Sequence, residues 1–430
     1  MTQPIIQIHC DGRWIPAARI EPLADEHARV EYLPDYVFGD PDPWPVSLTL
    51  PVRLITDLGN DPRPRMPAFL YDLVPQGQGR RLLVQLLDLR DHDGLALPLL
   101  LNGAFNPIGA LRIDQAVAFQ ADHARRNPPP AGADAGFSFR ELADRKEAVV
   151  EYLATHSMLA SGTTGVQGMA PKFLLTMDPE GRLHPDLALP DERAGSHWLV
   201  KGPRGRHRDD ELILRNEAAY LRVAAACGLD VYAAERIEQH GRWLLLPRFD
   251  RRVTREGVQR LAQESLASLA GLQGFGVPAN LNRLLEALRR HSDAPEADTR
   301  EFIKRDVLNR ALRNTDNHAR NHAVQRRADG SIRLTPLFDF APMYRDPELI
   351  PRALHWVDAD GRNLREWPEI VAHLELDDAE RRDLVQSLKQ FAEQIGQLAD
   401  LAANAGVDAE IIKACKPSID AQAESLARLN

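Results

Sequence analysis

The sequence predicts an α+β protein of two lobes, with a strand-rich part first and a mostly helical lobe after it. Short β-branched or alternating segments, bounded by proline or glycine, dominate the first part of the chain. From about Arg260 onward nearly every segment has helical periodicity, apart from one strand-like piece at 332–339. With 430 residues, 44% of them hydrophobic, the chain can bury a sizeable core in two or three domains.

A proline-rich stretch divides the first part of the chain. The segment 125–136 is rich in proline, glycine and alanine and has no apolar period, which is typical of a linker. The resulting division is an N-terminal subdomain at 1–125, a linker at 126–137, a second strand-containing region at 138–250 and a helical lobe at 251–430. Within the N-terminal subdomain the patterns predict strands at 7–16, 29–33 and 46–52 and helices at 69–73 and 79–88.

Helix and strand signals alternate after the linker. The patterns predict a helix at 139–155, strands at 171–177, 198–201 and 242–246, and a helix at 212–227. Gly228 follows that last helix at the position where glycine commonly ends a helix. Ligands often bind in the cleft between two such lobes, so we expect the functional site there.

Composition excludes several classes of protein. A net charge of −9 argues against a globally basic nucleic-acid binder. Three cysteines far apart in the sequence rule out a disulfide scaffold, and they form no CxxC pair that would indicate a cysteine metal site. No signal-peptide pattern is present, and no apolar stretch approaches the roughly 20 residues of a membrane helix. We therefore expect a cytoplasmic protein.

The helix at 212–227 carries a glutamate on its apolar face. Glu217 falls at helical spacing between Ile213 and Tyr220, and a buried carboxylate is costly unless it is paired. The preceding strand ends at Lys201 in an apolar run. An ion pair between the two would satisfy both charges and would hold an ammonium for phosphate oxygens, as phosphoryl-transfer enzymes do. The plainer interpretation is a surface lysine and a glutamate at the edge of the face.

Three polar residues of the helical part suggest the same chemistry. Asp316 and Asn321 are five residues apart, the spacing at which kinase catalytic loops place a base aspartate and a magnesium-binding asparagine. Asp339 is embedded in an apolar stretch and needs a partner, for which a divalent cation is suitable. Each pattern alone also fits a polar turn. Their joint occurrence, in the order that a kinase needs, is a much stronger indication.

Two further patterns have competing interpretations. The loop Ser161–Gly168 has three glycines and could cradle phosphates, although a flexible turn is an equally plain explanation. It precedes a strand, so it is neither a Walker A loop nor a dinucleotide-binding fingerprint. His318 and His322 are four apart, as in zinc-binding helices, but Arg320 between them would repel the ion. We expect His318 to orient the loop by hydrogen bonding.

Together these segments resemble the HipA family, the serine/threonine kinases of bacterial toxin–antitoxin modules, and the resemblance runs nearly end to end. The N-terminal blocks that carry it are YLPDY at 32–36, PVSLTLP at 45–51 and NPIGAL at 106–111. The blocks of the kinase core are Gly165-Val166-Gln167 with Lys172, Val200-Lys201, Asn216-Glu217, Arg248-Phe249-Asp250-Arg251, the segment 314–321 and the segment 336–339.

The resemblance implies a two-lobed protein-kinase-like fold, with ATP and Mg²⁺ as cofactors. It implies that Lys201 contacts the α- and β-phosphates, that Asp316 is the catalytic base with His318 beside it, and that Asn321 and Asp339 bind magnesium. The nucleotide-binding set that it implies is Thr164, Gly165, Val166, Gln167, Lys172, Lys201, Glu217, Arg248 and Phe249, the last two at the hinge near the adenine.

The resemblance also implies partners. Members of the family typically phosphorylate a serine of an aminoacyl-tRNA synthetase, which halts translation, and a small DNA-binding antitoxin usually neutralises them. Three departures indicate a divergent subgroup. The loop between Gln167 and Lys172 is two or three residues longer than usual, the autophosphorylated serine of the family aligns near Gly162, with Ser161 and Thr163 as neighbours, and the segment 263–265 is Gln-Glu-Ser instead of Gln-Glu-Asp.

Two other functions remain open from the sequence. The stretch 204–208 is locally basic, and Asp316, His318 and Asp339 could hold a metal, so a protein of this fold that binds or cuts DNA is one alternative. An ATP-binding interaction module without turnover is the other; the altered loop favours it, whereas the intact Lys201 argues against it.

Overall fold

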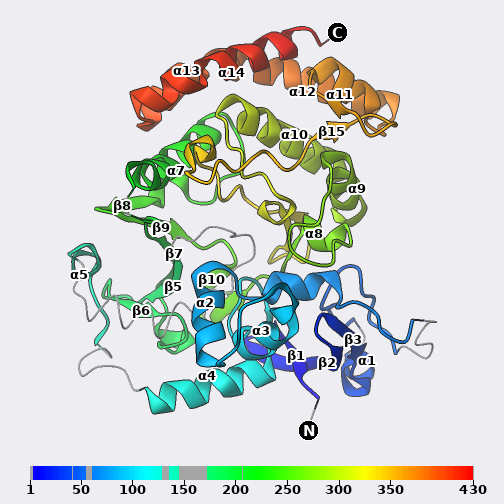
Figure 1. Cartoon of the computed structure of the whole chain (residues 1–430), viewed down its shortest axis with the longest axis vertical. Coiled ribbons are helices and arrows are strands. Elements are labelled where there is room, and N and C mark those ends of the chain that lie inside the picture. The colour runs from blue at the N-terminus through cyan, green and yellow to red at the C-terminus, as the bar shows by residue number, and fades with distance from the viewer. Residues whose placement is uncertain are drawn as a thin grey trace.

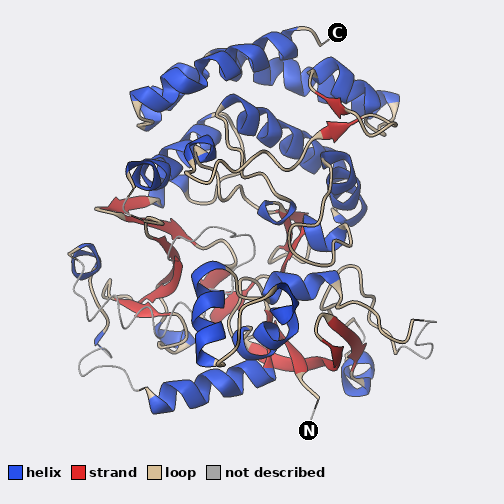
Figure 2. Cartoon of the chain, viewed as in Figure 1, coloured by secondary structure: helices blue, strands red, loops and turns tan. Residues whose placement is uncertain are grey.

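The structure, a computed structural model, describes residues 3–40, 42–54, 61–127, 135–144, 172–205 and 207–429. Figure 1 shows the N-terminal domain at one end of the molecule and the last helices of the chain at the other. Figure 2 shows that strands are concentrated in the N-terminal domain and the adjoining sheet, whereas helices dominate the C-terminal end. The two-lobed α+β architecture expected from the sequence is confirmed.

The N-terminal domain is a four-stranded antiparallel sheet, ordered β3-β2-β1-β4, with helices packed against it. Alternate residues of β1, among them Ile6 and Ile8, are fully buried, because one face of the sheet covers the domain core. The strands are β1 (Ile5–Cys10), β2 (Arg13–Ala24), β3 (His27–Tyr32) and β4 (Leu111–Ile113). The helices are α1 (Pro34–Gly39), η1 (Ala68–Leu73), α2 (Gly77–Leu86), η2 (Asp93–Leu95), α3 (Ala96–Gly103) and α4 (Asp114–Arg126).

Two of the strand predictions in this domain were wrong. The segment 7–16 is a hairpin rather than one strand, because Asp11 and Gly12 both have positive φ and turn the chain. The segment 46–52 is not a strand, and its described residues form only an isolated bridge between Ser47 and Leu50. The Tyr32 hydroxyl accepts from the backbone of this segment at Val46 and donates to it at Leu50, which holds it in a compact turn.

The second region contains a five-stranded antiparallel sheet, ordered β6-β5-β7-β9-β8. Its strands are β5 (Lys172–Met177), β6 (Leu183–Pro185), β7 (Ser196–Lys201), β8 (Glu238–His240) and β9 (Trp243–Pro247), and short helices η4 (Asp191–Arg193) and η5 (Ala234–Arg236) adjoin it. The three strands predicted here are confirmed within the described residues. Helix α7 (Arg208–Ala226) begins four residues before its predicted start, and Gly228, with φ of +79°, follows its end as expected.

Part of the predicted helix 139–155 lies outside the described residues. Helix α5 (Phe139–Ala143) covers its first turn, and Ser138 caps it together with Glu141. The predicted linker at 126–137 begins where α4 ends, at Arg126, and residues 128–134 of it also lie outside the described residues.

The C-terminal lobe is a helical bundle whose core also takes up the buried face of α7. Its helices are α8 (Leu266–Leu269), α9 (Leu281–His291), α10 (Pro295–Ala311), η6 (Ala319–Asn321), η7 (Met343–Arg345), α11 (Trp367–His373), α12 (Asp378–Gly396), α13 (Leu398–Ala405) and α14 (Ala409–Ala427). None of the helices in the described part of the chain is long and apolar enough to cross a membrane.

The expectation of a single strand-like piece after Arg260 was wrong. A three-stranded sheet is formed by β12 (Gln263–Ser265), β13 (Ala323–Arg326) and β14 (Ile332–Leu334), and hairpins by β10 (Arg251–Thr254) with β11 (Gly257–Arg260) and β15 (Trp356–Val357) with β16 (Asn363–Leu364). These strands have two to four residues each, which is too short for a periodic pattern.

The N-terminal domain joins the rest of the molecule through a buried polar cluster, here called the domain junction: Asn106, Gly109, Asp186, Arg248, Asp250 and Arg251. The backbone N–H of Gly109 donates to Asp250 Oδ2 over 2.9 Å. Gly109 has φ of +94°, and a Cβ there would lie 3.2 Å from the backbone nitrogen of Gln263. Two of the blocks noted in the sequence, NPIGAL and Arg-Phe-Asp-Arg, therefore meet at this contact.

Candidate active site

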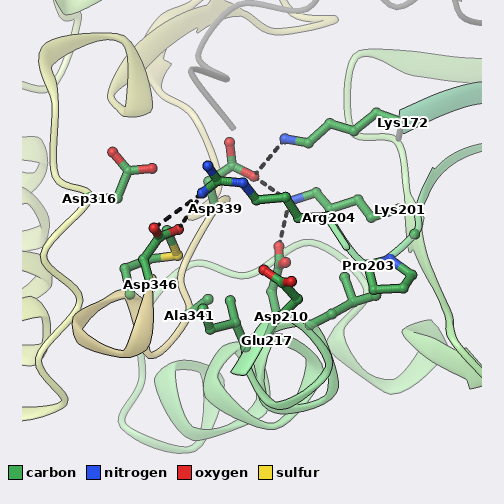
Figure 3. Close-up of a pocket in the computed structure, with 14 residues that line it drawn as sticks. Lys172, Lys201, Pro203, Arg204, Asp210, Glu217, Asp316, Asp339, Ala341 and Asp346 are labelled. Atoms are coloured by element: carbon green, nitrogen blue, oxygen red, sulfur yellow. Dashed lines mark hydrogen bonds and ion pairs between the residues drawn. The ribbon is translucent and has the colours of Figure 1, made fainter. Parts of the chain in front are cut away.

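A pocket opens between the end of β7, the first half of α7 and the loops of the C-terminal lobe, as Figure 3 shows. Charged side chains from both lobes dominate it. Its lining residues are Lys172, Lys201, Gly202, Pro203, Arg204, Asp210, Ile213, Leu214, Glu217, Asp316, Asp339, Ala341, Met343 and Asp346. The structure thus brings together in one pocket five residues that the sequence singled out from segments up to 167 residues apart: Lys172, Lys201, Glu217, Asp316 and Asp339.

The lysine at the end of β7 is held by carboxylates from two elements. Lys201 is buried, and its Nζ lies 2.5 Å from Glu217 Oε1, so the ion pair expected from the sequence is present. The same Nζ donates to Asp339, a contact that the sequence did not predict. Burial alone would lower the pKa of the Lys201 ammonium, but Asp339 and Glu217 raise it above its ordinary value. The group therefore stays charged at every physiological pH.

Asp339 lies in a loop, and not in a strand as expected, because β14 ends at Leu334. Its backbone φ is +50°, a left-handed conformation that a residue with a side chain adopts at a cost and that is often found at functional sites. Lys172 Nζ lies 3.6 Å from Asp339 Oδ1. Burial would raise the pKa of this carboxyl, but Lys172 and Lys201 hold it below its ordinary range. Asp339 is therefore ionised.

Lys172 is the first residue of β5 and pairs in register with Lys201 on the neighbouring strand, so both ammonium groups serve the same end of the sheet. It is buried, and this lowers its pKa to about 8, with the charge of Lys201 acting in the same direction. A buried lysine with a pKa of about 8 changes its charge close to physiological pH, and perturbed groups of this kind are often found at functional sites.

Asp316 lies in the loop between α10 and β13. Burial raises the pKa of its carboxyl, and the charge of Asp339 raises it further, whereas His318 lowers it. The His318 Nε2 lies 3.6 Å from Asp316 Oδ1 and makes no hydrogen bond among the described residues, so the hydrogen bond by which His318 was expected to orient the loop is not formed at this atom. No hydrogen bond reaches the Asp316 carboxylate from the part of the chain that is described, so these oxygens are free to accept a proton from a ligand.

Asn321 closes the same loop. Its Nδ2 donates to the backbone carbonyl of Asp316 over 2.8 Å. Its Oδ1 is buried and has no hydrogen-bond partner among the described residues. An unpaired buried amide oxygen is costly, and a hard cation would satisfy it. His322, the second histidine of the pair noted in the sequence, is buried against Phe302, and burial lowers its pKa to about 3.

Arg204 and Asp346 also line the pocket, although no sequence pattern predicted this. The Arg204 Nη1 donates to both carboxylate oxygens of Asp346, over 3.1 and 3.0 Å, and its Nη2 pairs with Glu348. In Figure 3 its side chain crosses the pocket toward Asp346. The sequence offered only a weak signal, an arginine three residues after Lys201, because its partner is 142 residues away.

The two residues expected at the nucleotide hinge, Arg248 and Phe249, line a separate cavity together with Leu199, Tyr232 and Phe338. The Arg248 guanidinium is also part of the buried domain junction, where it donates to Asp186 and Asp250. The expected phosphate loop and modification residues, Thr164, Gly165, Val166, Gln167, Ser161 and Thr163, lie outside the described residues.

The arrangement defines a class of protein. A sheet and a helix fix a lysine–glutamate pair, and a helical lobe supplies an Asp-x-x-x-x-Asn loop and a second aspartate, which is the organisation of a two-lobed kinase-like protein. Within that class the chain belongs to the HipA-like family: the family described as HipA-like C-terminal domain matches residues 164–399.

Comparisons with known proteins agree with this assignment. A protein of Sinorhizobium fredii (strain NBRC 101917 / NGR234) named "Putative kinase Y4mE" is 26% identical over 392 residues, covering 84% of each chain. A second protein of that strain, "Putative kinase Y4dM", is 27% identical over 214 residues, 46% of this chain and 48% of its own. The solved HipA of Shewanella oneidensis MR-1, in a complex with HipB and operator DNA, has the same fold: the TM-score is 0.65 at 17% identity, over 97% of this chain and 96% of that one.

Proposed function

We propose that the protein is a Mg·ATP-dependent serine/threonine protein kinase that acts as a growth-inhibiting toxin. The observation that carries the proposal is the position of Lys201: its ammonium is fixed between Glu217 and Asp339 in a pocket that also contains Asp316. In-line phosphoryl transfer needs positioning and charge neutralisation more than covalent chemistry, and these residues supply both.

The phosphate side of the pocket is assigned to the two lysines. Lys201 and Lys172 would bind phosphate oxygens of ATP, with the segment Thr164–Gln167 as a backbone cradle. Asn321 and Asp339 would hold a magnesium ion, and their chemistry supports this: among the described residues Asn321 Oδ1 is a buried oxygen without a partner, and Asp339 is ionised. A bound magnesium ion would supply further charge neutralisation at the phosphates.

The acceptor side is assigned to Asp316. Its carboxylate would accept the hydrogen bond of the substrate hydroxyl, orient the hydroxyl oxygen toward the phosphate and take its proton. His318, beside it, lowers the pKa of that carboxyl and so keeps more of it ionised near neutrality. The population of the protonated, inactive form of Asp316 increases as the pH falls, so the rate of phosphate transfer should decrease at acidic pH.

The basic stretch gives little support to the DNA-cutting alternative. Arg204 is paired with Asp346 and Glu348, and Arg208 with Glu410, so these two guanidinium groups are largely neutralised within the chain. Binding to DNA would need basic groups free to contact phosphates. The kinase interpretation uses the pocket as it stands.

We propose domain roles and partners by similarity to the family. We take 1–125 as an accessory domain, 138–250 as the nucleotide-binding lobe and 251–430 as the lobe with the catalytic loop. The HipA of Shewanella oneidensis MR-1 was solved with HipB and operator DNA, and by similarity we propose a small DNA-binding antitoxin as a partner of this chain. We propose a cytoplasmic protein target, of which an aminoacyl-tRNA synthetase is one candidate.

The test is transfer of label from γ-labelled ATP. Purified protein is incubated with Mg²⁺ and labelled ATP, alone and with a cell lysate. The Asp316→Asn variant is treated in the same way, and circular dichroism checks that it is folded. Label on this chain or on a lysate protein, absent from the variant, is the expected result. Well-folded protein that transfers no label, but nicks plasmid DNA with metal and without ATP, would move the assignment to the nuclease alternative.

A further inference from the structure

A second concave surface lies on the other flank of the catalytic loop, and of its lining only His318 has a role in the functions above. It is lined by Gln76 of the N-terminal domain, by Leu272, Phe275 and Val277 of the loop after α8, by His318 and by Leu354. We call these six residues the flanking groove. Helix α8, from which the loop departs, packs against η1 of the N-terminal domain, and Figure 1 shows α8 beside that domain. The groove, which is lined from both sides, therefore lies where the two domains meet.

The groove is continuous with the candidate active site through one side chain. His318 lines the groove, and its Nε2 is 3.6 Å from the Oδ1 of Asp316, a residue that lines the pocket of the candidate active site. A single imidazole therefore separates the carboxylate assigned to the substrate hydroxyl from the groove. An extended peptide advances about 3.3–3.6 Å per residue, so a substrate chain that ran from Asp316 past His318 would bring a side chain one to three residues from its hydroxyl to the groove.

The loop that forms the outer wall is held to the catalytic loop by an arginine. Arg320 Nη2 donates to the backbone carbonyl of Gly274 over 2.9 Å, and its guanidinium lies 5.0 Å from the centre of the Phe275 ring. Its Nη1 is 3.6 Å from Asp72 Oδ1 in the N-terminal domain. The wall is thus fixed relative to Asp316, as a recognition site must be.

The groove combines apolar walls with a polar atom that has no partner. The side-chain nitrogen of Gln76 is buried and has no hydrogen bond within the described part of the chain, whereas the Nε2 of His318 faces Asp316. Buried polar atoms are normally paired, so the Gln76 amide nitrogen indicates that a ligand supplies its acceptor. An apolar cavity with a few convergent polar groups is the usual form of a specificity site.

We propose that the flanking groove binds one apolar side chain of the protein substrate, a leucine- or methionine-sized residue within three positions of the phosphorylated hydroxyl, with the Gln76 amide bound to the adjacent peptide carbonyl. This inference rests on the proposed kinase function and adds the class of substrate sequence. It also gives the N-terminal domain a role in recognition, because Gln76 comes from that domain. The walls are mainly apolar, and the guanidinium of Arg320 in the lining already bonds the Gly274 carbonyl and lies near Asp72. The charge of an aspartate at the same position would therefore be desolvated without a free partner.

The experiment uses the full-length protein, Mg·ATP and serine peptides with an alanine–glycine background. One leucine is stepped from three positions before the serine to three positions after it, and an aspartate series is run in parallel. We expect one leucine position to raise kcat/KM about tenfold or more over alanine, the effect of burying one aliphatic side chain. The aspartate at that position gives no gain.

Two variants locate the effect. Val277→Asp adds a charge to the groove wall, and Val253→Asp adds the same charge to β10 outside the groove; the two valines are 38% and 37% exposed, so both variants should fold. Val277→Asp should remove most of the leucine gain, while Val253→Asp should keep it.

The outcomes separate this inference from the proposed function. Transfer to lysate proteins with a flat leucine scan, or equal behaviour of the two variants, would overturn the groove and leave the kinase intact. Absence of transfer to any protein or peptide would overturn the kinase and the groove together.

Discussion

The candidate active site and the domain junction are both buried clusters of opposite charge, yet they differ in how completely those charges are paired. In the junction, Asp186 accepts from Thr176, Asn106 and Arg248 and lies 3.2 Å from the His197 Nδ1, and Asp250 accepts from Gly109, Arg248 and Arg251. In the pocket, the Asp316 carboxylate receives no hydrogen bond from the described residues.

This difference separates structural from functional charge. A saturated cluster has no capacity left for a ligand, and its geometry is fixed by many partners. An unsaturated one carries a cost that only a ligand can recover. The junction holds the pKa of Asp186 well below its ordinary range, mainly because Arg248 outweighs the effect of burial, whereas burial raises the pKa of Asp316. Substitutions in the pocket should therefore lower the rate, whereas substitutions in the junction should lower the stability.

The largest expected effect is on the rate, at Asp316. Asp316→Asn keeps the shape of the side chain but removes the base, so we expect kcat to fall by about 10³-fold. Stability should stay level or rise, because the variant no longer buries a charge that lacks hydrogen bonds. Initial rates of phosphate transfer and urea unfolding on the same preparations measure both. If Asp316→Asn lowers the free energy of unfolding instead, Asp316 stabilises the fold in the same way as the carboxylates of the domain junction.

The second effect is on stability, at the junction. Asp250→Asn leaves Arg248 and Arg251 without their shared carboxylate, and breaking a buried ion pair costs about 3–5 kcal/mol. We expect the free energy of unfolding to fall by about that amount, measured by urea denaturation. Asp360→Asn is the matched control, because Asp360 pairs with Arg362 at the surface, where such pairs contribute little. Equal stability of the two variants would contradict the structural role of the junction.

The sequence was informative where structure is local. Helix α7 and strands β5, β7 and β9 followed from periodicity, and the Lys201–Glu217 pair followed from a carboxylate on an apolar helix face. The order of the motifs followed from the residues themselves, and the family resemblance added Lys172. The buried pairing of Arg248 with Asp186 could not be predicted from its block alone, since Asp186 lies 62 residues before it.

Contacts between distant segments were beyond sequence reasoning. Arg204 and Asp346 form an ion pair although they are 142 residues apart in the sequence, and Gln76 and Leu354 line the same groove. The segment 46–52 has a strand-like composition, but a buried glutamate of the other domain sets its conformation: Glu264 accepts from Ser47 Oγ over 2.7 Å and from the Leu48 N–H over 2.9 Å. Only tertiary packing can decide such cases.

The third prediction concerns that same glutamate, which belongs to neither cluster. Burial raises the pKa of Glu264 to about 7, and the neighbouring Asp72 acts in the same direction. Because the folded protein binds this proton more tightly than the unfolded chain, the stabilising contribution is full below about pH 4.5 and is lost as the pH rises to about 7. A carboxyl pKa of about 7 instead of 4.5 corresponds to about 3 kcal/mol.

Glu264→Gln isolates this contribution. A glutamine amide can donate to the hydroxyls of Ser47 and Ser268 and accept from the Leu48 N–H, so the contacts survive while the titration is lost. The unfolding free energies of wild type and variant are measured from pH 4.5 to 8. As the pH rises over this range, the wild type should lose stability relative to the variant. A difference that is constant across this range would show that Glu264 does not titrate there.

The smallest expected effect returns to the pocket and tests whether its second lysine acts on the nucleotide. Burial lowers the pKa of Lys172 to about 8, so its positive charge is present below that pH and is lost above it. If the ammonium binds phosphate, KM for ATP should rise several-fold between pH 7 and pH 9.5, because an attractive charge beside a polyanion disappears. Lys172→Arg keeps its charge over this range and should flatten the profile. Lys201, whose pKa is raised by Asp339 and Glu217, adds no titration of its own here. A rise in KM that is the same in wild type and Lys172→Arg would assign the alkaline limb to another group and leave Lys172 as a partner of Asp339 alone.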